Sequence, residues 1–240
     1  AAHETILSGD IGVIGDNSDN SFKVITVSDA GPDTRVDGFT ISDANNGFTS
    51  GAFGVTNSTI DIANCIFRNN TAYIGGGLFF GGSTVYVTNC LFHDNFGGAG
   101  GGAIASGTGT LVATHCNFIS NTGGDSGGAF FTQSSPDASF SNCLFYGNRA
   151  LNYDGSVIFE GGGSINLENC TVVGNTNRQA LALYAAATIR NCIVWGNPSG
   201  GISGGSVNAT YSILQTGYVG VGNSYGDPLF VDAGDPDGAD

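Results

Sequence analysis

Three side chains capable of acid–base chemistry stand at related positions in this sequence. Arg68 and His93 each follow a cysteine by three residues, and Asp94 comes directly after His93. An arginine can neutralise a substrate carboxylate, and a histidine beside an aspartate can move a proton, as the cleavage of a uronate polymer by a lyase requires. The alternative, which we favour, is a solvated surface cluster without a catalytic role.

A glycoside hydrolase would instead need two carboxyl groups about 5–10 Å apart in a cleft. The acids available for this chemistry are Asp61, Asp125, Asp154, Glu160 and Glu168. No two of them occupy equivalent positions in successive repeats of the sequence. The sequence therefore predicts no carboxylate pair, and a non-catalytic protein is favoured over a lyase or a hydrolase.

The elements that position these residues follow from a recurring phrase that contains all six cysteines. NCLFHDN, from Asn89 to Asn95, returns as NCIFRNN, HCNFISN, NCLFYGN, NCTVVGN and NCIVWGN, with cysteines 25, 26, 27, 27 and 22 residues apart. A period in the twenties indicates stacked supersecondary units. Leucine-rich repeats share this length, but their Leu-x-x-Leu-x-Leu frame is absent. Short β-branched or aromatic runs between Gly, Asn and Ser predict a parallel β-helix instead.

Each coil of this β-helix is predicted to hold three short strands and three turns, as in residues 84–87, 90–92 and 103–105. The chain then forms about eight coils of about 25 residues in an all-β solenoid. We expect one domain over residues 1–240, with N-terminal coils in 1–57, regular repeats in 58–206 and a closing segment in 207–240. The chain is expected to be a piece of a longer one.

The cysteines are predicted to be free thiols inside the coils. Strand alternation puts each cysteine on the same face as the residue two positions later. Those residues are Phe67, Phe92, Phe118, Phe145, Val172 and Val194. Parallel side chains on neighbouring coils hold their Cβ atoms about 4.8 Å apart, beyond the ~3.8 Å mean of a disulfide. A line of thiols also lacks the tetrahedral arrangement that zinc requires.

Two columns of asparagine accompany the cysteines. One column, directly before each cysteine, is Asn64, Asn89, His115, Asn142, Asn169 and Asn191; the other, five residues after it, is Asn70, Asn95, Asn121, Asn148, Asn175 and Asn197. Asparagine tolerates the left-handed backbone of a sharp bend, and its amide can bond to the next asparagine in a stack. Both columns are therefore predicted to be structural ladders at bends.

The outward positions of the same strands are unusually apolar. Ile66, Leu91 and Leu144 follow a cysteine by one residue, and Tyr146 and Trp195 follow one by three. An exposed apolar patch of this kind predicts a contact with another group. The alternatives are the C-terminal segment of this chain, a second copy or another surface protein, and sugar rings stacked on the aromatic side chains.

Acidic loops near both ends suggest calcium as a possible ligand. Asp16 and Asp19 in one loop, and Asp232, Asp235 and Asp237 in the other, place oxygen donors at short spacing around glycine. Calcium prefers such ligands, although neither loop has the full EF-hand spacing. The alternative is a solvated acidic turn.

Charge and hydropathy exclude several kinds of partner. Twenty acidic residues against six Lys and Arg give a net charge of −14. Nucleic acid is therefore a poor partner, as is an anionic membrane surface, because phosphate contacts need cations. No run of 18 apolar residues occurs, so no membrane insertion is predicted.

The NCxFxxN phrases, the glycine triplets that follow them, and then IVWGN, YSILQTGY and DPLFVDA resemble secreted right-handed parallel β-helix repeat proteins of bacteria. The similarity is greatest to members with a choice-of-anchor C-terminal region, and it covers nearly the whole chain. It implies the fold, secretion and surface attachment, but no particular activity. We expect an extracellular or cell-surface module with a structural, adhesive and self-assembling role and no required cofactor. The alternative is a polysaccharide lyase or glycoside hydrolase domain.

Overall fold

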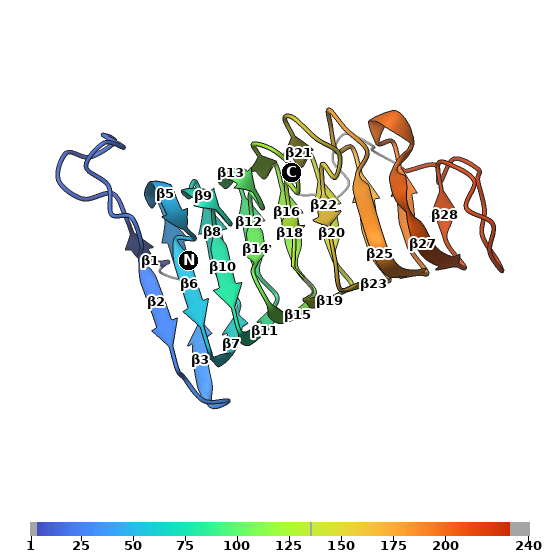
Figure 1. Ribbon diagram of the computed structural model, residues 1–240. Coiled ribbons are helices and arrows are strands. Elements are labelled where there is room, and N and C mark those ends of the chain that lie inside the picture. The colour runs from blue at the N-terminus through green and yellow to red at the C-terminus, as the bar shows by residue number, and fades with distance from the viewer. Residues whose placement is uncertain (1–3, 135, 231–240) are drawn as a thin grey trace.

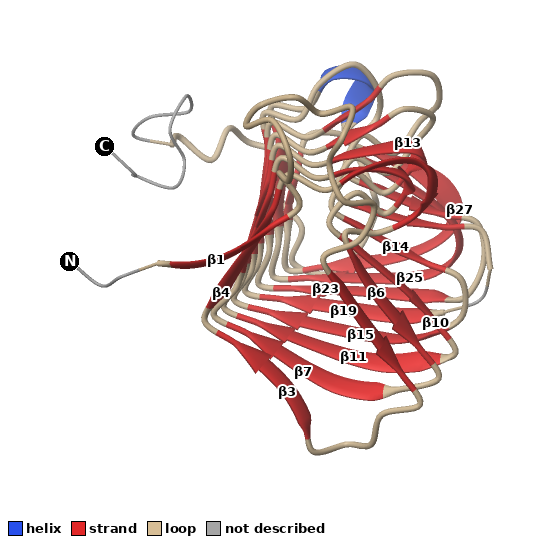
Figure 2. Cartoon of the chain, turned by 90° about the vertical axis from the view of Figure 1, so that its left-hand side faces the viewer, coloured by secondary structure: helices blue, strands red, loops and turns tan. Residues whose placement is uncertain are grey.

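A computed structural model gives the fold of residues 4–134 and 136–230. Short parallel strands stack side by side along an elongated solenoid, as Figure 1 shows. Seen along the stack in Figure 2, the chain winds around a single interior that three sheets enclose. The predicted all-β parallel solenoid is confirmed.

The repeating cysteine phrases form the nine-stranded sheet, called here the cysteine sheet. Each of its middle strands begins one residue after a cysteine, so the cysteine itself stands at the bend. In stacking order its strands are β1 (Thr5–Ser8), β4 (Phe39–Ser42), β8 (Ile66–Arg68), β12 (Leu91–His93), β16 (Asn117–Ile119), β20 (Leu144–Tyr146), β24 (Thr171–Val173), β26 (Ile193–Trp195) and β28 (Ile213–Leu214).

The second sheet, called here the long sheet, consists of two runs that meet in strand β25 (Leu181–Arg190), which also pairs with β27 (Ile202–Thr210). The first run is β2 (Ile25–Ser28), β6 (Phe53–Thr56), β10 (Leu78–Gly81), β14 (Ile104–Ser106), β18 (Phe130–Thr132) and β22 (Ile158–Glu160). The second run is β3 (Thr34–Asp37), β7 (Thr59–Ala63), β11 (Ser83–Thr88), β15 (Gly109–Thr114), β19 (Asp137–Ser141) and β23 (Ser164–Glu168).

A third, five-stranded sheet lies between the cysteine sheet and the glycine-rich bends, where the sequence predicted only a turn. Its strands are β5 (Asn45–Ser50), β9 (Thr71–Ile74), β13 (Phe96–Gly100), β17 (Thr122–Gly123) and β21 (Arg149–Ala150). The prediction of three strands per coil is therefore wrong for these turns. Glycine-rich segments pair here because the neighbouring turns bring the same backbone positions into register.

The stack is also slightly shorter than the predicted eight coils. The regular turns are the six that carry the cysteines. Toward the N-terminus, residues 9–24 leave the stack as a loop between β1 and β2, drawn in dark blue in Figure 1. Toward the C-terminus, the short 3₁₀ helix η1 (Pro198–Gly200) interrupts the turn, and β28 contains two residues.

Four successive turns in the middle of the solenoid stack aromatic rings in the interior. Phe67, Phe92, Phe118 and Phe145 are all fully buried, and the ring centroids of successive pairs lie 4.4, 5.2 and 4.9 Å apart in stacked geometry. Strand register places each phenylalanine directly beside the next. The predicted inward column is confirmed.

All six cysteines are buried free thiols, as predicted. Each thiol donates to a backbone carbonyl two residues earlier, for example from Cys116 Sγ to Thr114 O at 3.3 Å. Hydrogen bonds with the Cys116 and Cys65 side chains, together with burial, raise the pKa of the Cys90 thiol. These thiols pack as small hydrophobic groups in the core.

The bends on both sides of the cysteine strands contain residues with left-handed backbone. Only the first column, directly before the cysteines, adopts that conformation. The residue before each cysteine has φ between 52° and 54°, as at Asn64 (53°) and Asn191 (52°). At the second bend the left-handed residues are Asn69, Asp94, Ser120, Gly147, Gly174 and Gly196, each one position before the second asparagine column. The prediction of left-handed backbone at that second column is therefore wrong.

The second column instead turns inward and forms the asparagine ladder: Asn70, Asn95, Asn121, Asn148, Asn175 and Asn197, all buried. In a typical rung, Asn121 Nδ2 donates to Phe92 O at 2.9 Å and to Asn148 Oδ1 at 3.0 Å. Its Oδ1 accepts from the Nδ2 and backbone N of Asn95, at 3.0 and 3.2 Å. The amide is thus satisfied on both sides in a place that water does not reach.

Candidate functional site

The structure brings the predicted acid–base residues together on the outer face of the cysteine sheet. Arg68 and His93 are register partners on β8 and β12, and His93 Nδ1 lies 2.9 Å from Asp94 Oδ2. The Asp94 side chain is 56 % exposed, and Arg68 lies 3.9 Å from Glu4 Oε1. These contacts form a surface cluster, and the expectation that it has no catalytic role stays a prediction.

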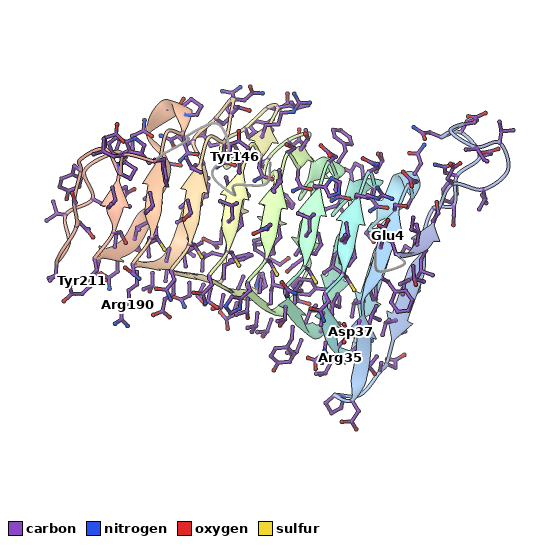
Figure 3. The ribbon with its side chains drawn as sticks, turned by 180° about the vertical axis from the view of Figure 1, so that it is seen from behind. Glu4, Arg35, Asp37, Tyr146, Arg190 and Tyr211 are labelled. Carbon is purple, nitrogen blue, oxygen red and sulfur yellow. The ribbon has the colours of Figure 1, made fainter. Side chains whose placement is uncertain are left out.

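The predicted binding surface lies on the same face. Ile66, Leu91, Leu144, Tyr146 and Trp195 are each half-buried. Tyr146 lies near the middle of the stack in Figure 3, whereas Glu4 marks its N-terminal end. Near the C-terminal end of this face, a hollow of about 320 Å³ is lined by Val173, Gly174, Trp195, Gly196, Asp227, Leu229 and Phe230. The chain's own C-terminal segment therefore reaches part of this surface.

A larger hollow, which the sequence did not predict, runs along a different corner of the solenoid. Its volume is about 540 Å³. The residues that line it are Tyr73, Ile74, Ala99, Asp125, Ser126, Phe131, Gln133, Tyr153, Asp154, Phe159 and Tyr184. We call it the aromatic groove, after its five aromatic side chains. It lies where the third sheet turns into the first run of the long sheet.

The groove extends along the axis of the stack, because its residues come from successive turns. Tyr73 belongs to β9, Ala99 to β13 and Tyr184 to β25, with two further turns contributing between them. Five turns span four strand spacings of about 4.8 Å, or about 19 Å. A linear polymer laid along the solenoid would contact several of these turns at once.

Strand alternation creates the aromatic row at the base of the groove. On β18, Phe130 points into the core and Phe131 points out of it. Phe131 pairs in register with Phe159 on β22, and their ring centroids lie 5.5 Å apart in stacked geometry. The ring of Tyr184 follows at 5.6 Å from that of Phe159, tilted by 57°. The three rings therefore form a row along the groove.

Glycines at the corner leave the space that the first ring of this row occupies. A Cβ atom added at Gly100 would lie 2.6 Å from a ring carbon of Phe131, and one at Gly127 would lie 2.8 Å from Phe131 Cβ. Any larger residue at Gly100 must displace the ring. The glycine-rich bends therefore shape the groove as well as turning the chain.

A buried carboxylate supports the far end of the row. Glu160 is fully buried, and its Oε2 accepts a hydrogen bond from the backbone N of Ala185 at 2.8 Å. The register of β25 shifts between Leu183 and Ala186, beside Tyr184. Glu160 thus fixes the bulge that presents Tyr184 to the groove, and we regard it as a positioning residue.

The comparisons with known proteins are decisive for the fold family. Residues 11–181 match the family described as "Right handed beta helix region". The chain belongs to this right-handed β-helix family. Neither the curated proteins nor the solved structures gave a match. The match ends shortly before Tyr184, and the described strands of this β-helix continue beyond it to β28.

The charged side chains that line the groove of this β-helix are both acidic. Asp125 Oδ1 accepts a hydrogen bond from Asn152 Nδ2 at 2.9 Å, and the carbonyl of Asp125 accepts from Tyr153 N at 2.8 Å. Asp154 lies one residue beyond Tyr153 and lines the same hollow. The sequence predicted no paired carboxylates, yet the loops bring these two into one cavity.

The repeat pattern could not reveal this groove in advance. Tyr73 lies on β9, eight residues after Cys65, whereas Tyr153 lies in the connection between β21 and β22, ten residues after Cys143, so no fixed period aligns them. One signal was available: Phe131 and Phe159 each follow an inward residue of the same column, Phe130 and Ile158. The outward positions of that strand, rather than those of the cysteine strand, identify Phe131 and Phe159.

The described residues give no support to the calcium prediction. Asp19 Oδ2 accepts from Val13 N at 2.9 Å, and Asp16 Oδ1 accepts from both the backbone N and the Oγ of Ser18. No group of three His, Cys, Asp or Glu side chains suited to a metal ion occurs in residues 4–134 or 136–230. Asp232, Asp235 and Asp237 lie outside the described residues.

The same part of the chain holds no helix long and apolar enough to cross a bilayer.

Proposed function

We propose that this β-helix is a glycan-binding module of a secreted or cell-surface protein, with a structural and adhesive role and no catalysis. The observation that carries the proposal is the aromatic groove. The flat faces of sugar rings carry C–H groups that stack on aromatic side chains, and hydroxyl groups can bond to carboxylates and amides at the rim. Rigid parallel strands hold the rings at fixed spacing, which suits a repeating polymer.

The exposure of the rings supports a ligand over a purely structural role. Tyr73, Tyr153 and Tyr184 are 55 %, 63 % and 57 % exposed, although each lines a hollow shared with Phe131 and Phe159. Large exposed aromatic side chains gathered at one place on a surface typically mark a binding site. The three exposed tyrosines around the aromatic groove supply such a place.

Calorimetric titration with a panel of linear oligosaccharides tests the proposal. We expect at least one of them to bind, and Tyr153→Ala or Phe159→Ala to weaken that binding about tenfold, because each variant removes a ring on which a sugar can stack. Tyr86→Ala is the matched control, because Tyr86 is 41 % exposed on β11 and does not line the groove. Binding that is weakened equally in the control, or absent for every oligosaccharide, would contradict the proposal.

A second candidate, glycoside hydrolysis, is favoured by one observation, the presence of Asp125 and Asp154 in a single cavity. Incubation with the polysaccharides that bind, followed by an assay for new reducing or unsaturated ends, separates the two functions. We expect no product. Turnover abolished by Asp154→Asn would establish a hydrolase at the groove, whereas turnover abolished by His93→Ala would point to the cluster on the cysteine sheet.

The adhesive role includes self-association through the half-buried apolar face of the cysteine sheet. Leu144→Lys places a charge in the middle of that face. If copies associate there, sedimentation of the unaltered protein should show oligomers. The oligomeric fraction should rise with salt, because screening weakens the repulsion between acidic chains. The Leu144→Lys variant should then remain monomeric. A monomer at high concentration in both low and high salt would remove self-association from the proposal.

A further inference from the structure

We infer that the aromatic groove selects a glycan whose sugars carry protonated amino groups, in preference to neutral sugars and uronates. This inference rests on the proposed function and names the class of ligand for the same site. It follows from which charges line the groove and which do not. The lining combines five aromatic rings with two carboxylates, those of Asp125 and Asp154.

The cations of the chain are placed elsewhere. The six are Lys23, Arg35, Arg68, Arg149, Arg178 and Arg190, and none of them is among the residues that line the groove. Arg35 pairs with Asp37 at 2.8 Å, and Arg149 Nε donates to Thr122 Oγ1 at 3.0 Å. A uronate polymer in the groove would therefore meet two carboxylates and no guanidinium or ammonium group. The carboxylates of the polymer and of the groove repel each other, and the net charge of −14 on the chain adds to this repulsion.

A protonated amine meets favourable groups at the same place. A cation is attracted to the face of an aromatic ring within about 6 Å, and three tyrosines present exposed rings to the groove. A carboxylate accepts up to about four hydrogen bonds, so the bond from Asn152 to Asp125 leaves capacity for a ligand ammonium group. Asp154 lies half-buried beside Tyr153, which places a second carboxylate near an exposed ring.

Acetylation of the amine removes this advantage without changing the sugar backbone. An N-acetyl sugar keeps the ring faces that stack on aromatics, but it loses the positive charge. The preference between the two forms therefore reports the contribution of charge alone, whereas binding of either form reports the stacking. This difference allows the inference to fail while the proposed function stands.

The experiment is a calorimetric titration with two matched ligands, the hexamer of glucosamine and the hexamer of N-acetylglucosamine, at pH 5.5 and low salt. Low salt limits the screening of charge, so a contribution from the carboxylates is measured where it is largest. We expect the amino hexamer to bind at least about tenfold more tightly, and the preference to shrink as salt is raised. Polygalacturonate, with and without calcium, is expected not to compete.

Asp154→Asn and Asp125→Asn should each reduce the preference for the amino hexamer while leaving the affinity for the acetylated hexamer nearly unchanged. Asp61→Asn is the matched control, since Asp61 lies on β7 and does not line the groove. Tyr153→Ala should weaken the binding of both hexamers.

Equal affinity of the unaltered protein for the two hexamers would overturn the inference but leave the proposed function intact. Tighter binding of polygalacturonate, with or without calcium, would also overturn the inference and leave glycan binding standing. If no oligosaccharide of any class binds, both proposals fail. Because these outcomes use the unaltered protein, they do not depend on the folding of a variant.

Discussion

Two rows of phenylalanine run along this solenoid, one inside and one outside, and they have different physical roles. The inner row, which includes Phe92 and Phe118, is fully buried, with stacked rings at 5.2 Å. The outer pair, Phe131 and Phe159, stacks at 5.5 Å at the base of the aromatic groove, where Phe131 is 4 % exposed and Phe159 is half-buried. Register places Phe131 beside Phe159 just as it places Phe92 beside Phe118, so the same pairing that builds a core can also line a groove. The direction of the side chain decides which role a residue has.

Replacement of a phenylalanine in the inner row is expected to destabilise the protein most. Phe118→Ala should lower the free energy of unfolding by about 3–5 kcal/mol, because it removes buried surface and leaves a cavity in the middle of the stack. Chemical denaturation followed by circular dichroism measures the change. A decrease below about 1 kcal/mol would mean that the inner row does not hold the turns together.

The asparagine ladder should give the next largest effect. Asn121→Ala removes an amide that makes four hydrogen bonds inside the protein. Unpaired groups left behind cost roughly 1–3 kcal/mol each, so we expect the free energy of unfolding to fall by about 3 kcal/mol. Asn166→Ala is the matched control, because Asn166 is half-buried on β23 and makes only a 3.5 Å contact with Ser139. Similar decreases in the free energy of unfolding for the two variants would show that the buried ladder position is no more important for stability than the half-buried one.

Replacement in the outer row should leave stability nearly intact while reducing ligand affinity. Phe159→Ala removes the ring that packs against Phe131 and Tyr184, for which we expect a cost in unfolding free energy of about 1 kcal/mol. Thermal unfolding of this variant and of Phe118→Ala, measured side by side, gives the contrast directly. Equal destabilisation by the two variants would mean that the outer row is simply a second core.

The smallest effect is expected at the exposed asparagine column, and it depends on pH. Hydrogen bonds from Asn64 Nδ2 at 2.7 Å and from Arg35 at 2.8 Å lower the pKa of the Asp37 carboxyl. Because the folded pKa lies below the unfolded value of about 3.9, the stabilisation is present above that pH and is lost as the pH falls through the folded pKa.

Asp37→Asn should therefore lower the melting temperature slightly at pH 7 and leave it unchanged in strong acid. Thermal scans between pH 2 and pH 7 make the comparison. A larger difference in acid than at neutral pH would contradict the direction of the pKa shift.

The features that could be read from the sequence are those that strand pairing repeats in every turn. The buried positions of Cys116 and Phe118 followed from alternation alone. For the second asparagine column the ladder was predicted correctly but the backbone was not, because residue types that tolerate left-handed φ stood at two adjacent positions, as at Asn69 and Asn70. The groove was not predicted because Tyr73, on β9, and Tyr153, in the connection between β21 and β22, stand at different distances from their cysteines, so no repeated position marks both as lining residues.

The asparagine ladder has a consequence for how such a chain can change. Every cysteine stands five residues before its ladder asparagine, whereas the interval to the next cysteine varies between 22 and 27 residues. Backbone pairing between strands sets the rise of the stack, and the variable segment includes the corner where the groove lies. We expect insertions at that corner to alter the aromatic groove while the cysteine sheet and the asparagine ladder stay unchanged. We therefore expect that the groove can change in one turn of the solenoid while the strand pairing of the other turns is retained.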